Sequence, residues 1–386
     1  MRRTAGGRGA EELDILVDSL GSTLGVEVTH STLSFHGTTI ARSLEPFTEI
    51  LLDVLARPSL EEEELGQLLR ESRSELTDAR DDDRALARRA LVRRLFGEHP
   101  YGRSVRGTLQ SIRGIEARDV RGYLRDRLVG GNLVLAVSGD IDEDAALALA
   151  QRIAAALPEG GALTDSTPPP ESFEGRHLVI VDKPDRTQTQ IYIGAMGTHP
   201  RDEDHFALHV ANTIFGGTFT ARMTQEVRAK RGWSYGAYSS LPFDRQRQAF
   251  SMWTFPKASD AAACVALELE MLESWHASGV TREELAWAKR YLVRSHAFSI
   301  DTASKRVSLS LDTALYGLPP GYYDNYRERI EAVTLEQVNQ AIQRRIDPRN
   351  LVVSVTGTES TIGKGLREAL AGVATYEVLP FDSEEL

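Results

Sequence analysis

The chain repeats itself once, and this internal duplication limits the folds that it can adopt. Residues 132–139 (Asn-Leu-Val-Leu-Ala-Val-Ser-Gly) match residues 350–357 (Asn-Leu-Val-Val-Ser-Val-Thr-Gly). Upstream, residues 60–65 match residues 280–285 at nearly the same separation. The first matching pair is rich in aliphatic and β-branched residues and ends at a glycine, which is typical of a strand. We therefore expect two copies of one scaffold that mixes strands and helices.

The second copy is longer than the first in one place. Leu20 and Gly21 match Phe215 and Gly216, but at a shorter separation than the other matching segments. The additional residues therefore lie between Gly216 and the apolar helical run around Cys264. An insertion on a duplicated scaffold indicates a place where one copy has become specialised.

Two domains fit the length of 386 residues, which leaves room for two cores of ordinary size. Proline and glycine gather in residues 158–175, which is typical of an exposed linker. We expect a first domain over residues 1–157, a linker over 158–175 and a second domain over 176–386. The predicted fold class is α+β, in which each domain has a mostly antiparallel sheet with helices on one face.

Local patterns indicate several elements. An alternating stretch broken near His30 predicts two short strands, and a run with helical spacing ahead of Pro58 predicts an amphipathic helix. A long helix carrying Leu65 and Leu76 follows. In the second half, we predict that strands 178–182 and 190–194 pair with each other, and that 249–255 is a further strand. The residues that carry the amphipathic pattern are Phe47, Ile50, Leu51, Val54 and Leu55.

Composition excludes several functional classes. A net charge of −11 argues against nucleic acid as a partner. No apolar run approaches the length of a membrane span, so no membrane partner is expected. The basic residues near Met1 precede no apolar segment, which predicts a cytoplasmic protein, or a periplasmic one if a signal upstream is missing. Cys264 lies in an apolar helical run and is predicted to be a buried small hydrophobe.

The inserted segment carries the candidate functional residues. Residues 215–238 read as a Gly-Gly turn, a short amphipathic helix, a glycine stop at Gly232 and a strand. This layout places Arg228 near the end of the helix and Tyr235 on the strand beyond it. Tyr238 would then point to the opposite face of that strand, into the core.

The segment resembles the second-half signature of the insulinase/pitrilysin zinc peptidases, in the branch of the mitochondrial processing peptidases. The resemblance extends over residues 10–360 and also rests on Val-Asp-Lys-Pro at 181–184, Gln-Thr-Gln-Ile at 188–191 and Phe-Gly-Glu-His-Pro-Tyr-Gly-Arg at 96–103. It implies one half of a clam-shell peptidase. It further implies that Tyr235 stabilises the oxyanion of a bound peptide, that Arg228 holds a peptide carbonyl, and that Gly216 and Gly217 shape a substrate-binding loop.

The zinc motif of that family, H-x-x-E-H, is absent from the sequence. Two histidines on one helical turn and a distal glutamate would hold the metal. Glu75 matches the position of the distal glutamate, with Glu71 one turn before it, but without the histidines we expect a surface ion pair there. His205 and His209 have helical spacing without a third ligand, and are expected on a polar helix face. The chain itself is thus predicted to hold no metal.

These observations lead to one functional hypothesis and two alternatives. The resemblance implies the non-zinc subunit of a heterodimeric zinc metalloendopeptidase. It would act on peptides only together with a paralogue that carries H-x-x-E-H and the zinc, and would be inactive alone. The chain could instead be an inert scaffold or assembly protein of the same fold, or a full peptidase whose N-terminal part is missing. An arginine and a tyrosine at the matching spacing favour the peptidase subunit, because a scaffold needs neither.

Overall fold

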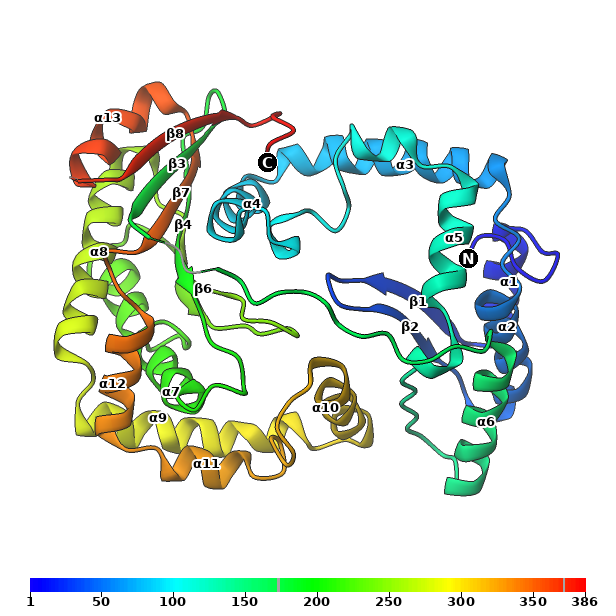
Figure 1. The fold of residues 1–386 in the computed structure, drawn as a ribbon. Coiled ribbons are helices and arrows are strands. Elements are labelled where there is room, and N and C mark those ends of the chain that lie inside the picture. The colour runs from blue at the N-terminus through cyan, green and yellow to red at the C-terminus, as the bar shows by residue number, and fades with distance from the viewer. Residues whose placement is uncertain (172–173, 371) are drawn as a thin grey trace. The chain divides into compact units, whose positions relative to one another are not determined.

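The structure is a computed structural model that describes residues 1–171, 174–370 and 372–386. The chain forms two compact units, which are described separately (Figure 1). Unit 1 comprises Met1–Leu76, Val105–Thr167 and Ile300–Leu315, and unit 2 comprises Thr77–Ser104, Pro168–Ser299 and Tyr316–Leu386. None of the helices in the described residues has the length and apolar character needed to span a bilayer. The expected linker, where described, contains neither helix nor strand, and the domain limits at 157 and 176 stay a prediction.

Unit 1 is mainly helical. Its hairpin pairs β1 (Thr23–Val28) with β2 (Leu33–Thr38) in antiparallel register, so that the predicted break near His30 is the turn. The helices with residues in unit 1 are α1 (Ala10–Ser19), α2 (Leu44–Ala56), α3 (Glu62–Asp78), α5 (Ala117–Arg127), α6 (Glu143–Ala156) and α10 (Ala303–Tyr316).

Helix α2 confirms the amphipathic pattern. Phe47, Ile50 and Val54 are buried, and they form one apolar cluster with residues of α1 and with Leu24 of β1. The exposed positions carry polar side chains such as Glu45 and Glu49, whereas Asp53 is buried and pairs with Arg8. Arg57 and Pro58 follow the last turn, and the helix ends at Ala56 as predicted.

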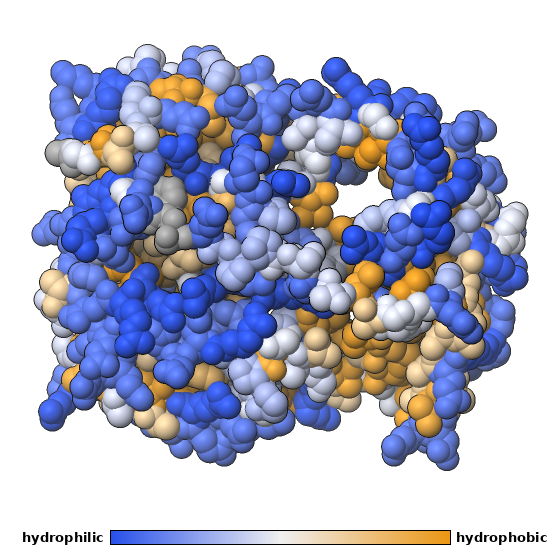
Figure 2. All heavy atoms as spheres, viewed as in Figure 1, coloured by the Kyte–Doolittle hydropathy of each residue, from blue (hydrophilic) through white to orange (hydrophobic). Residues whose placement is uncertain are grey.

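Residues 132–139 do not form the strand that their repeat predicts. Their counterpart in unit 2 is β7 (Leu351–Gly357), which pairs with one strand on each side. Among the described residues, no strand pairs with 132–139, and Val134 and Leu135 are exposed. A strand needs neighbours for its backbone hydrogen bonds, so the same sequence pattern stays irregular here. Apolar side chains accordingly reach the surface in Figure 2 where Figure 1 places β1, β2 and α6.

Unit 2 is built on a mixed sheet of six strands in the order β5-β6-β4-β7-β3-β8. The strand pairs β4–β6, β4–β7 and β5–β6 are antiparallel, whereas β3–β7 and β3–β8 are parallel. The other strands are β3 (Arg176–Asp182), β4 (Gln190–Met196), β5 (Ala237–Ser240), β6 (Ala249–Thr254) and β8 (Thr375–Pro380).

The predicted pairing of β3 with β4 is wrong, although both strands exist. Strand β7 lies between them and pairs with both. The connection through Lys183 is longer than a two-residue hairpin turn, and it leaves room for one intervening strand. Strand 249–255, in contrast, is confirmed as β6.

Helices cover the sheet of unit 2 mainly on one face, which confirms the α+β class. Leu178, Ile180, Ile191 and Ile193 belong to the large apolar cluster that these helices complete. The helices are α7 (His205–Phe215), α8 (Ala261–Ser278), α9 (Arg282–Ser295), α11 (Tyr326–Ala332), α12 (Leu335–Arg345) and α13 (Glu359–Ala369).

One helix from the first half of the sequence covers the other face of this sheet. Helix α4 (Asp83–Phe96) buries Leu86 and Leu91 against Val179 of β3 and Val352 of β7. The sheet residues on this face alternate with those on the helical face, as the two-residue period of a strand requires.

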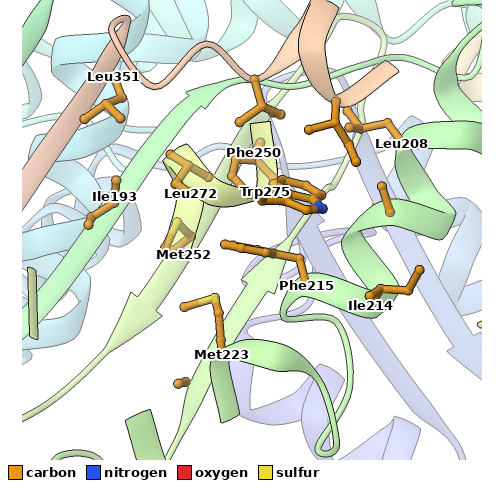
Figure 3. Packing of buried hydrophobic residues seen from close by; sticks show 14 of the residues in the cluster. Ile193, Leu208, Ile214, Phe215, Met223, Phe250, Met252, Leu272, Trp275 and Leu351 are labelled. Atoms are coloured by element: carbon orange, nitrogen blue, oxygen red, sulfur yellow. The ribbon is translucent and has the colours of Figure 1, made fainter. Parts of the chain in front are cut away.

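The centre of the main cluster in unit 2 is aromatic. The rings of Phe215 and Trp275 stack with their centroids 4.3 Å apart, with Phe250 and Met252 beside them (Figure 3). Such a stacked pair adds about 1 kcal/mol beyond the area that it buries. Because Phe215 is the last residue of α7, this packing fixes the point at which the Gly216–Gly217 turn begins.

Candidate functional site

Arg228 lies in a π-helical turn, Thr224–Lys230, which continues a short helical start at 222–223. The buried side of this turn is apolar, since Met223 and Val227 are fully buried in the main cluster. Thr224 donates a hydrogen bond to the carbonyl of Ala237, at 3.0 Å, and so ties the turn to the start of β5. π-helical turns are rare and are frequent at functional sites.

Gly232 makes the reversal that the sequence predicts. Its φ of +65° lies in the left-handed region, and its N–H donates to the carbonyl of Arg228 at 3.0 Å. The next residues are held by Ser234, which is buried. Its hydroxyl donates to the carbonyl of Gly236 and accepts from the N–H of Phe255. The backbone on both sides of Tyr235 is therefore fixed, although the Tyr235 side chain is 74% exposed.

Two predictions about the tyrosines need correction. Tyr235 does not lie on the strand, because β5 begins at Ala237. Tyr238 does lie on β5, but it is half-buried rather than in the core. Its ring stacks on Trp253 of β6, its partner across the sheet, at 6.0 Å. The core side of β5 is formed instead by Ala237 and Ser239, which are buried.

The structure brings Arg228 and Tyr235 together as predicted. The guanidinium carbon of Arg228 lies over the Tyr235 ring, 4.3 Å from its centroid, and over the Phe219 ring at 4.5 Å. The Nη1 atom of Arg228 is shielded from solvent and has no hydrogen-bond partner among the described residues. A buried donor without an acceptor costs about 1–3 kcal/mol, so the chain holds Arg228 Nη1 in this position at a cost in stability.

The neighbouring cations have acidic partners, so the lack of a partner is particular to Arg228 and not common to the segment. Arg222 makes a two-pronged pair with Glu284, at 2.7 and 2.6 Å. Lys230 and Arg231 both contact Glu226. Arg228 has no acidic partner in the part of the chain that the structure describes.

Phe219 is a site residue that sequence reasoning missed. It follows the Gly-Gly turn and is 59% exposed. A bulky apolar side chain two residues after a Gly-Gly pair was the available signal, but only the fold shows that it meets Arg228.

Gly216 and Gly217 have a packing reason to be glycine. A Cβ on Gly216 would lie 2.5 Å from the backbone nitrogen of Ser239, and one on Gly217 would lie 2.9 Å from Cα of Thr213. The carbonyl of Gly216 also accepts the N–H of Ser239. The turn is thus packed tightly against the start of the sheet, and its predicted contact with substrate stays a prediction.

The residues present do not fit a zinc ion. Among the described residues no group of three His, Cys, Asp or Glu side chains could hold a metal. Glu75 is exposed on α3 and makes no ion pair with any described residue, so the expected surface pair is wrong. Glu71 instead contacts Arg3 and Gln67, which hold the pKa of its carboxyl below the usual range.

The histidine pair of α7 is structural. His205 is buried between Thr198 and Tyr322, with hydrogen-bond distances of 3.0 and 3.1 Å, and His209 contacts the Tyr326 hydroxyl at 2.9 Å. Burial lowers the pKa of His205 to about 3 and that of His209 to about 4. The expected polar helix face is therefore wrong, because these rings face inward to partner hydroxyls.

One further buried carboxyl lies on α8, the helix that follows the inserted segment in the chain. Glu268 of α8 is fully buried, and neither carboxyl oxygen has a hydrogen-bond partner among the described residues. Burial raises the pKa of Glu268 to about 8, and the nearby Thr254 hydroxyl offsets only part of this rise. Cys264 lies one turn earlier, and it is buried as predicted.

Comparisons with known proteins agree with this fold. The family model described as "Peptidase M16 inactive domain" matches residues 114–292. A protein named an uncharacterized zinc protease, from Mycobacterium leprae, is 26% identical over 369 residues, which are 93% of this chain and 82% of that protein. A Helicobacter pylori protein named "Non-peptidase homolog YmxG" is 23% identical over 310 residues, which are 80% of this chain and 71% of that protein.

Among solved structures, a peptidase M16 inactive domain from Pseudomonas fluorescens superposes with a TM-score of 0.84. It has 24% sequence identity, and the match covers 92% of this chain and 85% of that one. The fold is thus that of an M16-type peptidase unit, and the sequence has no zinc motif. Residues 114–292 match the M16 family model, and the chain is similar to M16-type proteins over most of its length, while its 386 residues contain no H-x-x-E-H.

Proposed function

We propose that this chain is the non-zinc subunit of a heterodimeric zinc metalloendopeptidase. Its partner would be a paralogue that carries H-x-x-E-H and holds the zinc. The observation that carries the proposal is the free hydrogen-bonding capacity of Arg228 beside the exposed Tyr235. A protein that served only as a scaffold would gain nothing from an arginine N–H group that is held without an acceptor.

The two side chains suit two tasks in peptide hydrolysis. A phenol hydroxyl can donate to the oxyanion that develops on the attacked carbonyl, and this stabilisation is worth a few kcal/mol. A guanidinium can hold a backbone carbonyl with a charge-assisted hydrogen bond. We assign the first task to Tyr235, whose hydroxyl has no partner among the described residues, and the second to Arg228.

The proposal is tested by reconstitution with an H-x-x-E-H paralogue from the same genome. The chain alone should bind no stoichiometric zinc and cleave no peptide, whereas the mixture should form a complex and cleave. We expect the interface to bury more than roughly 1,000 Å². One tightly bound zinc per isolated chain would contradict the proposal. So would a chain that stays monomeric when the paralogue is present.

The second candidate function is an inert scaffold of the same fold. The similarity to a protein named a non-peptidase homologue favours it. The two functions differ in the demand on Tyr235, because a scaffold would assemble and act equally well with phenylalanine at this position.

A further inference from the structure

Glu268 of α8 is a buried acidic side chain that the proposed reaction does not use. It is fully buried, and neither of its carboxyl oxygens has a hydrogen-bond partner among the described residues. A carboxyl in such a place is stable only while it is protonated, because an unpaired charge in an apolar interior is strongly unfavourable. Loss of the proton therefore requires a change in the structure around it.

The Glu268 carboxyl lies beside the end of β6. The polar group next to it is the hydroxyl of Thr254, which also contacts the Sγ atom of Cys264 at 3.8 Å. Thr254 is fully buried and is the last residue of β6. Its cross-strand partner is Ala237, the first residue of β5, and β5 is the edge strand of the sheet. A charge at Glu268 would therefore act where β6 ends and β5 begins, and strand ends open more readily than strand centres.

The end of β6 also holds the segment that precedes β5. Phe255 directly follows Thr254, and its N–H donates to the hydroxyl of Ser234 at 3.0 Å. The same hydroxyl donates to the carbonyl of Gly236 at 2.6 Å. These two hydrogen bonds fix the backbone on both sides of Tyr235. A displacement of Thr254 would thus reach Ser234 through a single residue.

Among the described residues, no charged side chain offsets the cost of ionising Glu268. Burial raises its pKa to about 8, and the Thr254 hydroxyl opposes only part of this rise. Helices α12 and α13 pack against α8, but none of their charged groups acts on this carboxyl. Burial, and after it Glu268 itself, raises the pKa of the Cys264 thiol, on which Asp260 and Arg231 also act. Glu268 is therefore the group of this region that ionises in mildly alkaline solution.

We propose that Glu268 is a proton-operated switch: loss of its proton admits water between α8 and the end of β6, and this frees the hydrogen bond between Ser234 and Phe255. The protonated form keeps the backbone around Tyr235 fixed, and the ionised form releases it. The consequence, regulation of the Arg228–Tyr235 site by pH, rests on the proposed function. The structural change itself needs neither partner nor zinc.

The test is hydrogen exchange of the purified chain, followed by mass spectrometry from pH 6 to pH 9 and corrected for the intrinsic effect of pH on exchange. We expect segments 234–240 and 249–256 to exchange about tenfold faster at pH 9 than at pH 7, since most of the Glu268 carboxyls are then ionised. Glu268→Gln imitates the protonated form and should change by less than about twofold. Strand β3 should show no acceleration in either protein.

Two further variants sharpen the test. Glu270→Gln is the matched control, because Glu270 is exposed on the same helix, and it should behave as wild type. Thr254→Val keeps the β-branched shape without the hydroxyl. It should move the midpoint of the change to higher pH, because this hydroxyl lowers the pKa of Glu268.

Four results would overturn the switch. They are an acceleration that persists in Glu268→Gln, an equal acceleration in β3, exchange that does not depend on pH after correction, and a midpoint in Thr254→Val that stays or falls. Should Glu268→Gln fail to fold, the midpoint in Thr254→Val still decides.

The turnover of the reconstituted complex separates the switch from the proposed function. Turnover should fall above pH 8 in wild type and stay level in Glu268→Gln. An equal fall in both proteins would contradict the regulatory role. A complex without turnover at any pH would contradict the proposed function, while the exchange of segment 234–240 would still decide whether the switch exists.

Discussion

The guanidinium carbon of Arg228 lies 4.3 Å from the centroid of the Tyr235 ring, although a helix end and the Gly232 reversal separate the two residues in sequence. Thr224 and Ser234 fix the backbone on both sides of this contact through hydrogen bonds to Ala237 and Phe255. The pair is thus prepared before any ligand binds. Such preorganisation is what a site needs if it is to stabilise charge in a transition state.

Substitution of Arg228 should affect peptide binding as well as turnover in the reconstituted complex. A carbonyl clamp acts on the ground state, so we expect Arg228→Ala to raise KM and to lower kcat. Arg228→Lys should restore only part of the loss, because an ammonium cannot reproduce the planar fork. Steady-state kinetics check this, with Arg231→Ala as the control, since Arg231 is already paired with Glu226. A full rescue by lysine would contradict the clamp.

Glu268 should make unit 2 less stable as the pH rises. Its folded pKa of about 8 lies above the usual 4.5, so the folded protein holds a proton that the unfolded chain releases. The associated stability is complete below pH 4.5 and is lost as the pH rises through 8, amounting to about 3 kcal/mol by pH 7.

Glu268→Gln removes this titration and should reduce the fall of the unfolding free energy that Glu268 causes between pH 5 and 8, as measured by urea denaturation. Glu270→Gln is the matched control, because Glu270 is exposed on the same helix. Identical pH profiles for wild type and Glu268→Gln would show that the carboxyl is not buried as described.

The histidines of α7 should act in the opposite direction, in a pH window that overlaps the lower part of the window for Glu268. Their folded pKa values, about 3 for His205 and about 4 for His209, lie below the usual 6.5. The unfolded chain therefore binds more protons below pH 6.5, and stability falls as the pH falls. Each histidine should remove about 2 kcal/mol between pH 7 and pH 5. The difference between His205→Gln and wild type across this range measures the effect, with the exposed His36→Gln as the control.

Lys183 should be essential to the attachment of α4 to the sheet. It is buried at the end of β3, and its Nζ donates to the carboxylate of Asp83 at 2.8 Å and to the carbonyl of Arg80 at 2.6 Å. Lys183→Ala leaves both acceptors without this donor and should cost about 2–4 kcal/mol of unfolding free energy. Lys364→Ala removes an exposed pair with Glu368 and should cost less than about 0.5 kcal/mol. Equal effects of the two changes would contradict this account.

Sequence patterns predicted those parts of the fold that depend on neighbours along the chain. The spacing of Phe47, Ile50 and Val54 determines a helix face, and Gly232 determines a reversal, because each depends on local geometry. The order of the strands depends on distant segments. The alternation in β3 and β4 gives no sign that β7 lies between them, and residues 132–139 have a strand pattern without a neighbour to pair with.

The same limit applies to the site. The resemblance indicated Arg228 and Tyr235, and the structure places them in contact. It could not indicate that Phe219 is the second ring over the guanidinium, or that Glu268 is buried without a partner, since both depend on what packs around them. Helical spacing places Glu268 on the same face as Cys264, but the sequence alone would favour a surface position, because glutamate is rarely buried.

The measurement that tests the central claim most directly is the cleavage rate of the reconstituted complex with Tyr235→Phe. This change removes one hydroxyl and keeps the ring that stacks on Arg228, so assembly and melting should stay as in wild type. We predict that kcat falls about 10²-fold, which corresponds to about 2.7 kcal/mol of lost transition-state stabilisation, while KM changes little. Tyr238→Phe, whose ring packs on Trp253, should be nearly silent. A wild-type rate for Tyr235→Phe would contradict the oxyanion role and would leave the scaffold as the better account of this chain.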